Sequence, residues 1–122
     1  MTESRRLLVL DDDPLVGMLI ETVARLAGVP SRLTQTHGEF FEALVDWNPT
    51  HLVLDLTMPG MAGEEVLAEL GRRTCTARVV VASGVERERL DAALACGVDA
   101  GLEMAGVLPK PFLPAALRAL LA

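Results

Sequence analysis

Short apolar runs alternate along the whole chain with segments whose apolar residues recur at helical spacing. The runs are continuously apolar, as is typical of strands buried on both faces of a parallel sheet. Such strands, each joined to the next through a helix, predict a doubly wound α/β sheet with right-handed crossovers. The expected strands are residues 7–10, 31–34, 51–54, 79–82 and 106–108.

Capping residues place the helices between these strands. We expect Asp13 to cap the first helix, Pro14 to lie in its first turn and Gly28 to end it. The apolar residues at helical spacing in this segment are Leu15, Leu19, Val23 and Leu26. The other expected helices are residues 39–47, 64–70, 86–96 and 114–121. We see no linker or repeat, so residues 1–122 are interpreted as a single domain.

Charge and cysteine content narrow the class of protein. The formal net charge of −6 argues against nucleic acid as the main ligand, because phosphate contacts need Lys and Arg. Cys75 and Cys96 have no metal-site or redox-motif spacing, which favours a reduced, cytoplasmic protein. Residues 1–6 are polar and lack the apolar segment of a signal peptide, and no apolar run approaches the ~20 residues of a membrane helix.

Polar residues stand at the carboxyl ends of four of the expected strands. They are Asp11, Asp12, Asp13, Asp55, Ser83 and Lys110. Ligands of doubly wound sheets bind at this edge, so we expect these side chains to converge there. Crowded carboxylates need a cation, and oxygen ligands suit Mg²⁺. A carboxylate beside such an ion can attack phosphorus, while a lysine and a hydroxyl bind the phosphoryl oxygens.

Four segments together resemble the receiver domain of two-component response regulators. Residues 7–13 are similar to the first strand of that family and its acidic pair. Residues 55–63, which contain Met58-Pro59-Gly60, resemble its phosphorylation segment. Residues 81–84 and 110–112 resemble its switch hydroxyl and its lysine-proline segment. The resemblance covers about residues 7–121, and it implies the flavodoxin-like fold with strand order 2-1-3-4-5.

The resemblance also implies a role for each matching residue. Asp55 would accept a phosphoryl group, Ser83 would hydrogen-bond to it and Lys110 would pair with it. The implied Mg²⁺ ligands are Asp11, Asp12, Asp55 and the backbone carbonyl of Thr57. Asp13 is interpreted as the helix cap and not as a ligand.

By the same resemblance, the chain is expected to be a switch that catalyses only its own phosphorylation and dephosphorylation. The implied partner is a histidine kinase or a histidine phosphotransfer protein, with no nucleic acid and no membrane. No output domain is expected after the lysine. A stand-alone receiver, a phosphorelay shuttle and a receiver cut from a larger protein all stay open.

Three features depart from the family pattern or lie outside it. Val107 occupies the position, three residues before the lysine, at which receivers usually carry Tyr or Phe. The stretch from Cys96 to Gly106 is longer than the usual connection between the fourth helix and the fifth strand. The last helix has Arg118 as its single polar residue. Either its alanines are tolerated at the surface, or it is covered by a second copy of the chain, another partner or a further domain.

Other functions use the same residues. A haloacid-dehalogenase-type phosphatase would use Asp11 and Asp13, but it also needs an acidic metal ligand after the lysine, and residues 111–122 contain no Asp or Glu. A nucleotide or flavin module needs a phosphate-binding loop where three aspartates stand. A receiver-like module that is not phosphorylated is the remaining alternative.

Overall fold

The computed structural model describes residues 4–122 as one five-stranded sheet with five helices. The strands are β1 (Leu7–Leu10), β2 (Ser31–Thr34), β3 (His51–Asp55), β4 (Arg78–Ser83) and β5 (Glu103–Pro109). The helices are α1 (Pro14–Leu26), α2 (His37–Trp47), α3 (Gly63–Arg72), α4 (Arg87–Asp99) and α5 (Pro114–Leu120). Strands and helices alternate from β1 to α5, as the hydrophobic pattern predicts.

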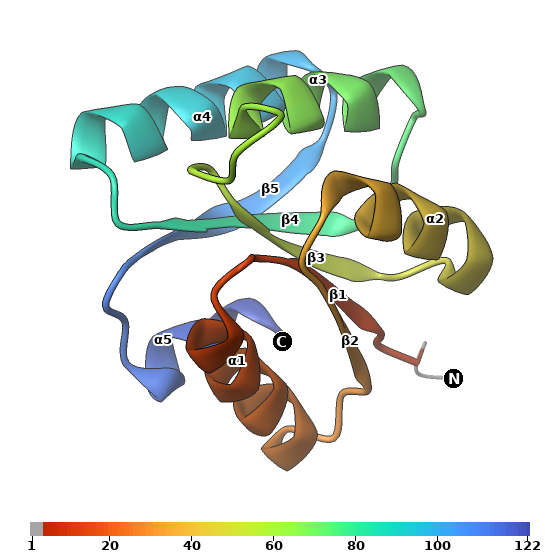
Figure 1. Cartoon of the computed structure of the whole chain (residues 1–122), viewed down its shortest axis with the longest axis vertical. Helices are drawn as coiled ribbons and strands as arrows, with labels where there is room; N and C mark the ends of the chain where they lie inside the picture. The colour runs from red at the N-terminus through yellow and green to blue at the C-terminus, as the bar shows by residue number, and fades with distance from the viewer. Residues whose placement is uncertain (1–3) are drawn as a thin grey trace.

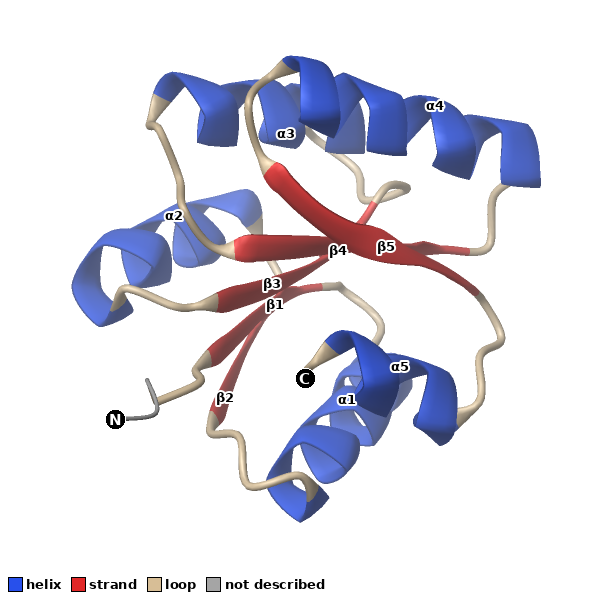
Figure 2. Ribbon diagram, turned by 180° about the vertical axis from the view of Figure 1, so that it is seen from behind, coloured by secondary structure: helices blue, strands red, loops and turns tan. Residues whose placement is uncertain are grey.

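All neighbouring strands are parallel, in the order β2-β1-β3-β4-β5. Helices α2, α3 and α4 cover one face of the sheet, and α1 and α5 cover the other (Figures 1 and 2). Each face has its own core, built mainly from Leu, Val and Ala. The predicted doubly wound fold and its strand order are therefore confirmed.

The fifth strand and the fourth helix are both longer than predicted. The expected strand at 106–108 runs from Glu103 to Pro109, and α4 continues past Cys96 to Asp99, which leaves residues 100–102 between them. The expectation of an unusually long connection is therefore wrong. Gly97 lets α4 pack closely on β5, since a Cβ there would lie 2.3 Å from the sulfur of Met104.

Of the four apolar residues at helical spacing in α1, Val23 is buried and the three leucines are not. Leu15 and Leu26 are 75% and 73% exposed, and Leu19 is also exposed. The buried residues of α1 are Gly17, Ile20, Val23 and Ala24. Gly17 faces β2, where a Cβ on it would lie in ordinary contact, 3.4 Å from a methyl carbon of Leu33. The side of α1 that carries Ile20, Val23 and Ala24 therefore packs on the sheet, and Leu15 and Leu26 remain outside.

The last helix is buried along one side. Leu117 and Leu121 are fully buried, while the alanines at 115, 116 and 119 are exposed.

Among residues 4–122, no helix is both long and apolar enough to cross a membrane. The expectation about a signal peptide rests partly on residues 1–3, which lie outside the described residues.

Candidate functional site

Three aspartates meet where the central strands end. Asp11 directly follows β1, and Asp55 is the last residue of the adjacent strand β3. Carboxylate oxygens of Asp11, Asp12 and Asp55 all lie within 4.8 Å of one another. Asp11 and Asp55 are buried, whereas Asp12 is exposed. We call these three residues the acidic cluster, and it forms where the strand ends predict it.

Lys110 reaches the acidic cluster from the end of β5. Its Nζ lies 2.6 Å from Asp11 Oδ2 and 3.6 Å from Asp55 Oδ2. The backbone N–H of Lys110 donates to the carbonyl of Ser83 at 2.9 Å, which fixes the start of the lysine side chain beside β4. One ammonium therefore stands between two buried carboxylates.

Burial sets the electrostatics of Asp11. Loss of water around its carboxyl group raises the pKa of Asp11 above its usual value. The hydrogen bonds from Lys110 and from the N–H of Asp13 oppose this rise, and the negative charge of Asp55 adds to it. Ionised Asp11 thus depends on nearby positive charge, and a cation that replaced the ammonium would be favoured there.

The two oxygens of Asp55 have different surroundings. Oδ1 accepts hydrogen bonds from the N–H of Thr57 at 3.0 Å and from its hydroxyl at 2.9 Å. Oδ2 faces the Lys110 ammonium, and no donor among residues 4–122 lies within hydrogen-bond distance of it. Oδ2 is therefore the oxygen available to react with an incoming electrophile.

Ser83 ends β4 next to this site. Its side chain is fully buried, and its Oγ accepts a long hydrogen bond of 3.4 Å from the N–H of Val85. Within the described part of the chain, the hydroxyl makes no hydrogen bond to the acidic cluster. Val85 and the half-buried Val107 both pack on the core beneath α2, α3 and α4.

Asp13 lies outside the acidic cluster. Its Oδ1 accepts from the N–H of Leu15 at 2.9 Å, and the residue caps α1 as predicted. A phosphatase that used Asp11 and Asp13 as a reacting pair is therefore not supported, because Asp13 is committed to the helix end.

One group near the site was missed from the sequence. Arg89, at the start of α4, donates to the carbonyl of Leu56 at 3.5 Å and to the Glu64 carboxylate at 3.3 Å. Arg89 belongs to a charged segment that reads as a solvated helix face, and 33 residues separate it from Leu56. No sequence motif marks this contact, and only the packing of α4 beside α3 creates it.

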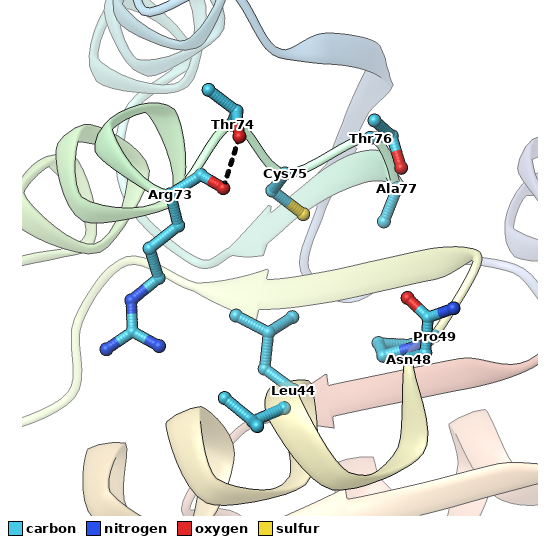
Figure 3. A pocket seen from close by; sticks show the side chains of 9 residues that line it. Leu44, Asn48, Pro49, Arg73, Thr74, Cys75, Thr76 and Ala77 are labelled. Carbon is cyan, nitrogen blue, oxygen red and sulfur yellow. Dashed lines mark hydrogen bonds between the residues drawn. The ribbon is translucent and has the colours of Figure 1, made fainter.

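A cavity of about 460 Å³ lies at a different place, between the end of α2 and the loop from α3 to β4 (Figure 3). Its lining residues are Leu44, Val45, Asn48, Pro49, Arg73, Thr74, Cys75, Thr76 and Ala77. None of them is acidic or belongs to the predicted site. The cavity lies beside the entry to β4, whereas the acidic cluster lies at the strand exits.

The acidic cluster fits a hard divalent cation. Its donors are all carboxylate oxygens, and Mg²⁺ typically takes one or two carboxylates and keeps several waters. Asp12 gives such an ion access from solvent, and the two buried aspartates supply negative charge at low dielectric.

The chain is similar over nearly its whole length to known signalling proteins. The family model described as "Response regulator receiver domain" matches residues 7–122. The DNA-binding transcriptional regulator NtrC of Escherichia coli K12 is 30% identical over 104 residues, which are 85% of this chain and 21% of that protein. Response regulator MprA of Mycobacterium ulcerans is 34% identical over 122 aligned residues, which cover 97% of this chain and 50% of that protein. The chain thus spans between a fifth and a half of these relatives.

Solved structures agree with this likeness. A response regulator receiver domain from Bermanella marisrubri superposes with a TM-score of 0.78 and 28% identity, covering 94% of this chain and 92% of that one. A CheY-like receiver domain protein from Methanospirillum hungatei gives a TM-score of 0.80 at 19% identity, over 94% of this chain and 88% of that one, and shares the fold.

Proposed function

Because this chain belongs to the response regulator receiver domains of two-component systems, we propose that Asp55 is its phosphoacceptor and takes the phosphoryl group from a phosphohistidine donor. The observation that carries this proposal is the arrangement of Asp55 and Asp11 around the Lys110 ammonium. Two buried carboxylates beside one lysine suit a group that brings further negative charge together with a cation. A nucleotide or flavin module gains no support from this arrangement.

The reaction transfers a phosphoryl group between two atoms. Oδ2 of Asp55 attacks phosphorus and forms a P–O bond, while the P–N bond to the donor imidazole breaks. The electron pair of that bond stays on the imidazole nitrogen, which takes up a proton. The hydrogen bonds from Thr57 to Oδ1 hold the carboxylate and leave Oδ2 directed at the donor.

The ligands proposed for Mg²⁺ are the carboxylates of Asp11, Asp12 and Asp55 and the backbone carbonyl of Thr57. When bound, the ion would neutralise charge on the phosphoryl oxygens. Lys110 would pair with one phosphoryl oxygen, and the Ser83 hydroxyl would donate a hydrogen bond to another. Rotation of the Ser83 side chain toward the phosphoryl group would draw its Oγ away from the N–H of Val85, which lies at 3.4 Å, and would move the loop between β4 and α4.

The chain then works as a cytoplasmic single-domain switch that catalyses only its own phosphorylation and dephosphorylation. Its partner for phosphoryl transfer is a histidine kinase or a histidine phosphotransfer protein. The exposed alanines of α5 offer a surface to a second copy of the chain or to a further domain. Val107 has no ring to move into the space beside Ser83, so the output change proceeds through the loop after Ser83 and through α4.

Intact-mass measurement tests the assignment of Asp55. The protein is incubated with Mg²⁺ and a small acyl-phosphate donor, and the mass gain of one phosphoryl group is followed. We expect Asp55→Asn to abolish the gain, whereas Asp46→Asn, an exposed aspartate of α2, retains it. Undiminished labelling of Asp55→Asn would place the phosphoacceptor elsewhere, with Asp11 as the first residue to examine.

A further inference from the structure

Arg89 joins the start of α4 to the segment that carries Asp55. Its Nη2 donates to the Leu56 carbonyl at 3.5 Å, and its Nε and Nη2 both lie 3.3 Å from the Glu64 carboxylate. We infer that Arg89 is a positioning residue through which α4 senses the phosphorylation of Asp55. The inference rests on the proposed function, because it requires Asp55 to be phosphorylated.

The loop side of this contact is rigid and adjacent to the phosphoacceptor. Leu56 directly follows Asp55, and its side chain is buried in the core. Its carbonyl also accepts from the N–H of Gly63 at 3.4 Å. A Cβ on Gly63 would lie 2.7 Å from the Cα of Leu56, so the loop closes tightly on its own start. A shift of the backbone after Asp55 therefore also moves the Leu56 carbonyl.

The α4 end of the Arg89 contact is also held in place by backbone hydrogen bonds and by buried packing. Arg89 lies in the first turn of α4, where its own N–H and that of Leu90 donate to the carbonyl of Glu86 at 3.0 and 3.2 Å. Leu90 is fully buried in the core shared with α3. Helices α3 and α4 lie side by side over this face of the sheet (Figure 1). Glu64 on α3 thus binds the guanidinium, and the first turn of α4 fixes the position from which the Arg89 side chain extends.

Phosphorylation acts on the other end of the same first turn. When the Ser83 side chain rotates toward the phosphoryl group, its Oγ moves away from the N–H of Val85, now 3.4 Å from it, and the loop before α4 shifts. The Arg89 contact to Leu56 is already at the outer limit of a hydrogen bond, so a small displacement breaks it. The first turn of α4 is then less restrained. This route needs no aromatic residue at Val107.

Hydrogen exchange on the full chain, with intact mass from the same samples, tests the inference. In the wild-type protein we expect phosphorylation to speed exchange in residues 85–92. In unphosphorylated Arg89→Ala that exchange is already faster by roughly two- to tenfold, the factor that corresponds to losing one hydrogen bond. This variant still gains the phosphoryl mass, yet exchange at its helical residues 89–92, beyond the N–H of Val85, no longer responds to it.

Two further variants separate coupling from general stability. Arg87→Ala removes the same charge from the same helix turn, but Arg87 pairs with Asp91 inside α4, at 3.2 Å, so the response is retained. Arg89→Lys keeps the charge and can satisfy one acceptor, so it restores part of the response. A full response in phosphorylated Arg89→Ala overturns the inference. So does a phosphorylated wild type with unchanged exchange at the helical residues 89–92, although the proposed function then stands. Absence of any phosphoryl mass on the wild type overturns both.

Discussion

Replacing Asp12 by Asn tests the electrostatic reading of the acidic cluster, because it removes one charge and leaves both buried aspartates in place. Two unit charges 4.8 Å apart, the largest separation within the cluster, repel by about 0.9 kcal/mol in water and about 3.5 kcal/mol at an effective dielectric constant of 20. Asp12 is exposed, so the lower value applies to each of its two repulsions. Its attraction to Lys110 offsets part of the gain. We expect Asp12→Asn to raise the metal-free free energy of unfolding by about 1 kcal/mol.

The same substitution should weaken stabilisation by Mg²⁺. An ion at ten times its dissociation constant adds about 1.4 kcal/mol to the stability of a folded protein that alone binds it. We expect the wild type to gain this amount and Asp12→Asn to gain less than half of it at the same Mg²⁺ concentration. The measurement is urea denaturation in chelator and in Mg²⁺, with the ionic strength kept constant.

Asp13→Asn is the matched control for Asp12→Asn. It removes a neighbouring negative charge outside the acidic cluster, and Asn caps a helix about as well as Asp. This variant should therefore keep the wild-type response to Mg²⁺. The reasoning is refuted if Asp12→Asn in chelator is no more stable than the wild type, or if its gain from Mg²⁺ equals that of Asp13→Asn.

Three other outcomes follow from the structure. Burial lowers the pKa of His51 from 6.5, so the unfolded chain takes up a proton there before the folded chain does. The contribution of His51 to stability is present above pH 6.5 and is lost as the pH falls toward its folded pKa. Denaturation midpoints across this range should therefore fall less in His51→Gln than in the wild type. Lys110→Ala should still gain the phosphoryl mass, more slowly, but should lose the accompanying change in exchange or partner binding; a normal response would remove the lysine from the switch. The phosphorylated form should decay slowly, because neither Val85 nor Thr57 carries an amide or acid to orient a water. Val85→Glu or Thr57→Asn should shorten its lifetime in a time course of phosphoryl mass, and fast decay that neither change affects would contradict this.

The five strands and the acidic residues at their ends follow from local sequence signals, whereas the strand order follows from the resemblance to receiver domains. A continuously apolar run such as residues 7–10 is buried on both faces, and an acidic residue directly after it must stand at the carboxyl edge of the sheet. The same reasoning places Asp55 and Lys110 beside Asp11. Their convergence needs the strand boundaries, which the hydrophobic pattern supplies, and the strand order, which the resemblance to receiver domains implies.

Helical spacing in the sequence does not determine which face of α1 packs on the sheet. The spacing of Leu15, Leu19 and Leu26 is helical, yet α1 turns the side that carries Gly17 and Ile20 to the sheet. Helical spacing shows that a helix is amphipathic, but a helix with two apolar stripes can turn either of them inward.

Side-chain contacts across long sequence separations were also beyond prediction. The reach of Arg89 to Leu56 depends on the distance between α3 and α4, which no residue type encodes by itself. The fifth strand was assigned too short because its pairing with β4 shifts register at Val79 and Val80, and Gly106 interrupts its apolar pattern.

The 2.6 Å contact between Lys110 and Asp11 makes the two proposed ligands of this site cooperative. While the ammonium holds Asp11, a metal ion must compete with it for the same oxygen. A phosphoryl group on Asp55 attracts the ammonium to itself and frees that oxygen. Each ligand thus lowers the cost of binding the other, and thermodynamic reciprocity requires the two enhancements to be equal. We therefore expect the unphosphorylated protein to bind Mg²⁺ weakly, and its affinity to rise if Asp55 is phosphorylated as proposed, so that the metal would help to retain the phosphorylated form.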